Sequence, residues 1–147
     1  MTIIEKVLAL QEVELFSRVS TEALAHLAAI AHEENLEEGR ELFREGDAAD
    51  ALHLILAGSI RLHRDGRDVT QAGAGDVIGT WALLDVDTRV VSAAVTESAH
   101  LLRIDRYEFY DLIADHLEIT RGVFSALVKR VRRLIEPLQR EPGTDAA

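Results

Sequence analysis

The residues best suited to chemistry lie in one short stretch, "GTWALLDVDTR", residues 79–89. Arg89 offers planar and permanently charged donors, and Gly79 lets a ligand come close to the backbone. A short helical turn after Gly79 would add free N–H groups, which is a favourable setting for a phosphate. The alternative is an ion pair between Arg89 and an acid of its own loop, Asp85 or Asp87. The spacing therefore indicates either an anion site or a local ion pair.

The histidines form no motif that is typical of a metal site. His53, His63 and His100 fall on expected strands, but there is no His-x-His pair and no carboxylate at a matching spacing. The sequence also has no Gly-x-Ser-x-Gly elbow, P-loop or paired-carboxylate motif. We therefore expect no metal site, no required cofactor and no enzymatic activity.

Composition excludes several classes of protein. The chain has 147 residues and no cysteine, so it suits one domain without disulfides or thiolate metal sites. Its formal net charge of −10 opposes non-specific binding to nucleic acid. No apolar run approaches the roughly 20 residues that span a bilayer. We expect a cytoplasmic protein that makes no contact with a membrane.

Hydrophobic periodicity predicts helices on either side of a run of short strands. Residues 2–32 are expected to be helical, with Ser20 as an N-cap, and the polar segment "HEEN" is expected to end them. Residues 35–104 alternate in the manner of strands and contain regularly spaced glycines. Asp65-Gly66 predicts a two-residue hairpin turn. The segments "RVVSAAVT" and "AHLLRI" read as two further strands.

The last part of the chain, residues 105–138, is predicted to be helical again. Asp105 is a candidate N-cap for a short helix, and a long helix follows from Leu117. Apolar positions in this helix step by three and four, as in a coiled coil: Leu117, Thr120, Phe124, Leu127, Val131, Leu134 and Leu138. This seam would suit a homodimer, although a helix packed on its own domain would look similar.

This order of elements predicts the fold class and the domain limits. We expect a mainly β fold with flanking helices, in which an antiparallel jelly-roll β-roll is preceded and followed by helices. Residues 1–138 would form one domain. Pro137 should end or kink the last helix. Residues 139–147 are expected to form a disordered tail.

Within this frame, the segment "GRELFREGDAADALHLILAGSIRLHRDGR", residues 39–67, resembles the front half of a cyclic nucleotide-binding domain. The resemblance extends over roughly residues 10–136. It implies a β-roll of the kind found in catabolite activator protein and in regulatory subunits of the cyclic-AMP-dependent kinase. In that family the phosphate-binding segment usually reads Phe-Gly-Glu-Leu-Ala-Leu, a few variable residues, then Pro-Arg-Ala-Ala-Thr.

The phosphate-binding segment of this chain keeps only part of that pattern. The positions that match it are Gly79, Ala82, Leu83, Arg89 and Ser92, and the positions that depart from it are Thr80, Trp81, Thr88, Val90 and Val91. The resemblance implies that Thr80 stands where the family glutamate accepts the ribose 2′-hydroxyl. Losing a hydrogen bond to a charged group costs about 1.5–3 kcal/mol, roughly ten- to a hundredfold in affinity.

The resemblance implies a ligand-sensing regulatory module. Its ligand would be cAMP, cGMP or another small phosphate-bearing molecule, bound weakly by residues 79–83 and 89–92 and sensed through the C-terminal helices. The alternative is a structural or dimerisation domain whose vestigial pocket is plugged by Trp81. The sequence given ends at Ala147, short of the helix-turn-helix of catabolite-activator relatives, so we expect no direct DNA binding by this chain.

Overall fold

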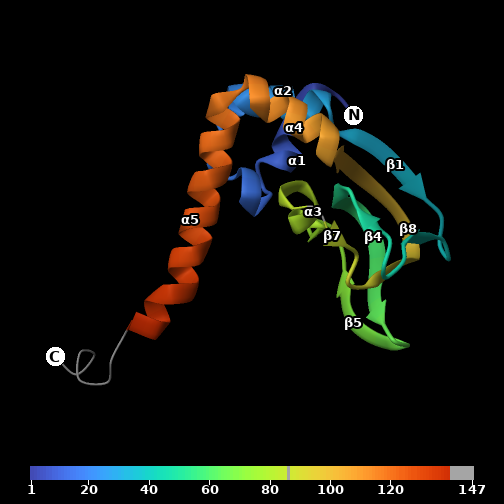
Figure 1. The fold of residues 1–147 in the computed structure, drawn as a ribbon. Coiled ribbons are helices and arrows are strands. Elements are labelled where there is room, and N and C mark those ends of the chain that lie inside the picture. Colours follow the sequence, from blue (N-terminus) through green and yellow to red (C-terminus); the bar gives the residue numbers. More distant parts are fainter. Residues whose placement is uncertain (86, 140–147) are drawn as a thin grey trace.

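The computed structural model describes residues 1–85 and 87–139 and confirms a mainly antiparallel β fold with flanking helices (Figure 1). The N-terminal helical part holds α1 (Ile3–Leu10), the 3-10 turn η1 (Glu14–Phe16) and α2 (Thr21–Ala29). Ser20 caps α2 as predicted, since its Oγ accepts a hydrogen bond from Ala23 N at 3.2 Å.

The β-roll is built around two long antiparallel strands, β4 (Ala51–Arg64) and β8 (Ser92–Asp105). The main sheet has the order β1-β8-β4-β5, and two short strands join it, β2 to β8 and β6 to β4. The bounds of these are β1 (His32–Leu36), β2 (Glu41–Phe43), β5 (Arg67–Ala72) and β6 (Val77–Ile78). A separate pair joins β3 (Ala48–Ala49) to β7 (Asp87–Thr88).

Two predictions about strands were wrong. Residues 2–32 are not helical throughout, because α2 ends at Ala29 and β1 begins at His32. The roll therefore starts three residues earlier than predicted. The two strands predicted around residues 89–104 are one strand, β8, and "RVV" precedes it. Gly58 lies inside β4 with φ 91°, and a Cβ there would collide with the backbone of Ser98 on β8.

The predicted hairpin between β4 and β5 is confirmed. Arg64 pairs with Arg67, and the two turn residues, Asp65 and Gly66, have φ 51° and 73°. Positive φ at both positions is the geometry that joins two twisted strands most closely.

The long strands separate two apolar cores. Leu52, Leu54 and Ile104 pack into a cluster with the N- and C-terminal helices, while Ile55 and Leu101 pack into a second cluster inside the roll. Alternate residues of a strand point to opposite faces of the sheet, so one strand can serve both cores. This arrangement holds the roll and its helices together as one unit.

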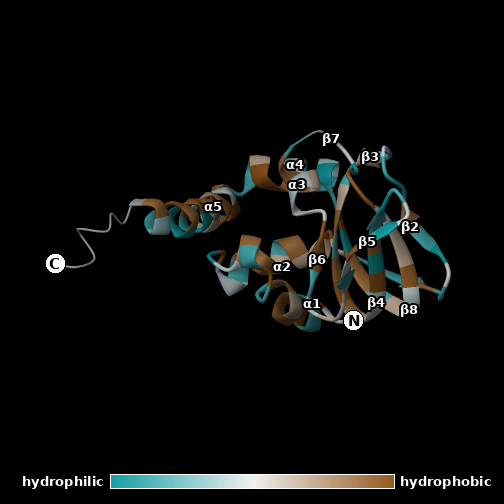
Figure 2. Ribbon diagram, turned by 90° about the horizontal axis from the view of Figure 1, so that it is seen from below, coloured by the Kyte–Doolittle hydropathy of each residue, from teal (hydrophilic) through white to brown (hydrophobic). Residues whose placement is uncertain are grey.

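The short helix α3 (Thr80–Leu84) lies between β6 and β7, and the C-terminal part holds α4 (Arg106–Asp115) and α5 (Leu117–Gln139). Asp105 is the N-cap residue of α4, although its side chain makes no capping hydrogen bond. The first half of α5 packs on the body through Ile119, Val123 and Ala126, and its second half projects away from the roll (Figures 1 and 2).

The end of α5 differs from prediction. The helix continues through Pro137 to Gln139, so the first residue of the predicted tail is helical. The rest of the predicted disordered tail, residues 140–147, lies outside the described residues. None of the helices in the described part of the chain is both long enough and apolar enough to cross a membrane.

Candidate functional site

The turn that begins α3 depends on Gly79. This residue has φ 84° and stands at the N-cap position, where the left-handed backbone favours glycine. A Cβ at Gly79 would lie 2.5 Å from Arg89 Nη1 and 2.7 Å from the carbonyl oxygen of Ala51. The absence of a side chain therefore lets the Arg89 guanidinium lie directly against the backbone of the turn.

The Arg89 side chain is buried, with only 7% of the residue exposed. Its Nη2 donates to the carbonyl oxygen of Ala51 at 2.9 Å, and its guanidinium carbon lies 4.1 Å from the centroid of the Phe43 ring. Its Nε has no hydrogen-bond partner among the described residues. A buried N–H without a partner is costly.

Burial is the largest influence on the charge state of Arg89. Burial lowers the pKa of the guanidinium, while the carboxylates of Asp50 and Asp47 raise it. Arginine nevertheless stays protonated in proteins at neutral pH. The roll therefore holds a permanent positive charge beneath the turn that follows Gly79.

A pocket with a volume of about 420 Å³ opens beside this guanidinium. Six of the predicted binding residues line it: Gly79, Trp81, Ala82, Arg89, Val90 and Val91. Trp81 and Val90 are 61% and 65% exposed, so neither side chain is packed inside the pocket. The space beside Arg89 is open, which argues against the plug that the alternative prediction assigned to Trp81.

The structure places the other three predicted residues elsewhere. Thr80 lines a separate pocket of about 370 Å³ between η1 and α5, together with Arg130. Leu83 is fully buried among the core residues beneath the helices. Ser92 accepts a hydrogen bond from Glu45 N at 2.9 Å. Leu83 and Ser92 thus hold the pocket segment in place at its two ends.

Two buried side chains near the pocket were not recognised from the sequence as part of the site. Arg106, the first residue of α4, uses Nη1 to donate to the carbonyls of Ala49, Ala82 and Asp85. His53 is 5% exposed, and burial, together with the positive charges of Arg89 and Arg103, lowers its pKa to about 3. The sequence alone does not indicate that Arg106 and His53 are buried, because an arginine at a helix start and a histidine on a strand are usually exposed.

Comparison with known proteins connects this pocket with a family. A family model described as "Cyclic nucleotide-binding domain" matches residues 33–116. The CRP-like cAMP-activated global transcriptional regulator of Mycobacterium tuberculosis is 29% identical over 124 residues, which cover 81% of this chain and 55% of that protein. The cyclic AMP receptor protein of Thermus thermophilus is 32% identical over 100 residues, which cover 65% of this chain and 46% of that protein. The chain spans about half the length of these relatives.

A solved structure shows the same architecture. The N-terminal domain of a transcriptional regulator from Streptomyces coelicolor A3(2) matches with a TM-score of 0.81 at 27% identity. The match covers 87% of this chain and 95% of that chain. The fold class and the resemblance expected from the sequence are both confirmed.

Proposed function

Because this chain belongs to the cyclic nucleotide-binding domain family, we propose that the pocket beside Arg89 binds a small phosphate-bearing ligand and that the C-terminal helices respond to it. The first candidates for the ligand are cAMP and cGMP. The observation that carries the proposal is a buried guanidinium that lines an open pocket and whose Nε has no partner in the part of the chain that the structure describes. A phosphate oxygen would accept a charge-assisted hydrogen bond there.

The guanidinium, rather than the end of α3, supports this proposal. The first turn of α3 closes on itself, since Ala82 N donates to the carbonyl oxygen of Gly79 at 3.0 Å. The helix has only five residues, so its dipole is small. Arg89 would therefore provide most of the attraction for a phosphate.

Two features lead us to expect weak binding of a cyclic nucleotide. Thr80 lines the pocket on the α5 side and not the one beside Arg89, so it offers no acceptor for a ribose there. Asp47 and Asp50 act electrostatically on Arg89 and offset part of its attraction for an anion. We expect a dissociation constant on the order of 100 µM for cAMP.

Two contacts support a relay from the pocket to the C-terminal helices. Arg106 of α4 donates to the carbonyl oxygen of Ala82, a residue that lines the pocket. Arg130 of α5 lies over the ring of Trp81, with its guanidinium carbon 5.2 Å from the ring centroid. A ligand that moves Trp81 or the turn would therefore change contacts of both helices. The module we propose is regulatory and not catalytic, and acts in the cytoplasm.

A second candidate role, dimerisation, is favoured by the apolar stripe of α5. We define this stripe as the exposed apolar residues Phe124, Val128, Val131, Leu134, Ile135 and Leu138, which are 41–82% exposed. From Val128 onward they lie on the second half of the helix, which projects from the body (Figure 2), while Phe124 lies on its first half. We propose that this stripe pairs with its copy in a homodimer, whether or not the pocket is occupied.

Isothermal titration calorimetry with cAMP and cGMP tests the ligand proposal. We expect weak one-site binding that falls at least tenfold in Arg89→Met, which keeps the bulk and removes the charge. Arg67→Met, a matched change on the exposed hairpin, should bind as the wild type does. If titrations at millimolar ligand show no binding, or if Arg89→Met binds as tightly as the wild type, the ligand proposal is contradicted. The dimerisation role would then be the remaining proposal.

A further inference from the structure

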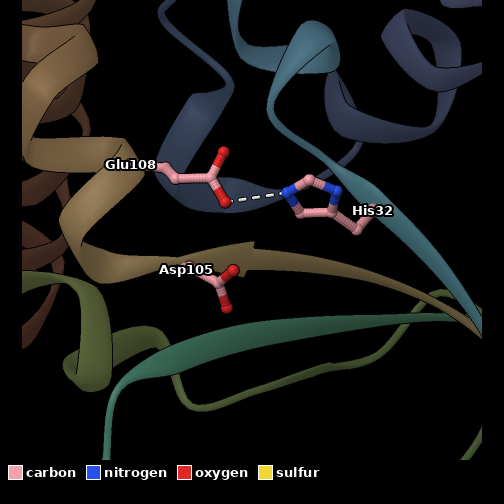
Figure 3. Close-up of side chains that lie close together, drawn as sticks. All are labelled: His32, Asp105 and Glu108. Atoms are coloured by element: carbon pink, nitrogen blue, oxygen red, sulfur yellow. Dashed lines mark hydrogen bonds and ion pairs between the residues drawn. The ribbon is translucent and has the colours of Figure 1, made fainter.

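Three side chains of types that can bind a metal ion lie close together where the roll joins α4, away from the Arg89 pocket. His32 begins β1, Asp105 ends β8 and Glu108 lies in the first turn of α4 (Figure 3). One donor atom from each lies within 4.8 Å of the other two. His32 Nε2 is 2.8 Å from Glu108 Oε1. None of the three lines the pocket beside Arg89.

The backbone fixes the positions of all three residues. β1 pairs with β8 in a register that places His32 opposite Arg103, two residues before Asp105. Asp105 is the N-cap of α4, so Glu108 follows it at a fixed helical spacing. Donors held by regular elements need little reordering to bind an ion, which lowers the entropic cost of binding.

Neighbouring charges orient these side chains and also weaken their attraction for a cation. Arg103 Nε lies 2.9 Å from Asp105 Oδ1, so this carboxylate has a cationic neighbour. The guanidinium and the positive end of the α4 dipole both oppose a cation. Two carboxylates, Asp105 and Glu108, favour a cation. Their two negative charges balance the charge of a divalent ion when His32 is neutral.

We propose that His32, Asp105 and Glu108 bind a divalent transition-metal ion, with Zn²⁺ as the best-suited ion. One imidazole nitrogen and two carboxylate oxygens make a mixed donor set that suits Zn²⁺ better than Mg²⁺, which prefers oxygen alone. Three protein ligands leave a position for water. The side chains are 35–43% exposed, so an ion and its water have access from solvent.

Binding would connect β1 and β8 to the helix that carries Arg106. The ion would replace the contact between His32 and Glu108 with bonds that join three elements at one point. Since the unfolded chain does not hold these donors together, binding would stabilise the folded state. With three ligands and an opposing guanidinium, we expect a dissociation constant on the order of micromolar.

The test uses the full chain after treatment with a chelator. Calorimetry with ZnCl₂ should show one site per chain, and Zn²⁺ should raise the midpoint of thermal unfolding while Mg²⁺ leaves it unchanged. His32→Ala and Glu108→Gln should each weaken Zn²⁺ binding at least tenfold. Both positions are partly exposed, and circular dichroism will verify that each variant is folded. Co²⁺ added to the wild type should give the visible absorption of a bound ion.

His100→Ala provides the matched control. His100 Nε2 contacts Glu33 Oε1 at the same 2.8 Å, but this pair does not belong to a three-donor group of the described residues. Zn²⁺ binding should be unchanged in this variant. If His32→Ala and Glu108→Gln bind Zn²⁺ as tightly as the wild type, or if His100→Ala removes as much binding as they do, the proposed site is wrong.

Discussion

Three buried side chains provide the polar chemistry of the roll: His53, Arg89 and Arg106. Arg106 Nη1 donates to three carbonyls, so Arg106 is a structural residue that connects α4 to the pocket segment. Among the described residues, Arg89 and Arg106 each have an unpartnered Nε, and His53 has an unpartnered Nδ1. Arg89 lines the open pocket and Arg106 does not, which separates the residue that we propose binds the ligand from the residue that holds the structure.

The buried His53 should make stability depend on pH. Its pKa is about 3 in the fold and 6.5 at its ordinary value, so between these values the unfolded chain binds a proton that the folded chain does not. Stability that is present above pH 6.5 is therefore lost as the pH falls. Between pH 7 and pH 5, the wild type should lose about 2 kcal/mol more than His53→Leu. Urea unfolding at the two pH values measures the free energy of unfolding of both proteins. Equal losses of stability in the wild type and in His53→Leu would refute the prediction.

Arg106 should contribute strongly to stability. Replacing it with leucine leaves three carbonyls without their charged donor, and we expect a cost of about 3 kcal/mol. The matched change Arg67→Leu, on the exposed hairpin, should alter stability by less than about 0.5 kcal/mol. Chemical unfolding of the two variants compares them. A small effect of Arg106→Leu would show that α4 is held by its apolar contacts alone.

At the scale of elements, α5 divides into two halves with different surroundings. Its first half buries Ile119, Val123 and Ala126 against the body. Its second half carries most of the exposed apolar stripe, in which Leu134 and Leu138 are 66% and 82% exposed. The heptad seam predicted from the sequence lies mainly on this exposed side, although its Leu127 packs against the core of the body, and Ile119, Val123 and Ala126 lie off the seam. Two apolar faces on one helix are expected if one faces the domain and the other a second copy.

A charge in the stripe should prevent self-association. Leu134→Glu places like charges opposite each other in a dimer, so sedimentation velocity should show a monomer where the wild type is a dimer. Arg132→Glu changes an exposed residue of the same helix that lies off the stripe, and should remain dimeric. A wild type that sediments as a monomer at about 100 µM would remove the dimer proposal.

At the scale of the whole molecule, sequence patterns predicted the elements whose side chains follow simple rules. Alternating apolar residues predicted the roll, Asp65-Gly66 predicted the hairpin, and the spacing from Gly79 to Arg89 predicted which segment lies beside the buried charge. These patterns depend on local geometry, which the sequence encodes directly.

Elements stabilised by distant partners were missed. The polar strand β1 was not predicted because its side chains form polar contacts across the sheet instead of packing in a core. Glu34 forms an ion pair with Arg103, and Glu33 forms a hydrogen bond with His100. Whether Thr80 contacts a ligand stays a prediction; in the structure it lines the pocket between η1 and α5. The cluster brings His32 to Asp105 and Glu108, each more than 70 positions away, and no local spacing reveals all three residues.

The most direct test of the ligand-binding claim is a titration of ¹⁵N-labelled protein with cAMP, followed by NMR. The account predicts that the amide signals of Gly79, Ala82 and Arg89 shift together and saturate, and that these shifts are absent in folded Arg89→Met. If these signals stay in place at millimolar cAMP, or if shifts occur only in the basic segment at residues 129–133, the pocket beside Arg89 does not bind the nucleotide.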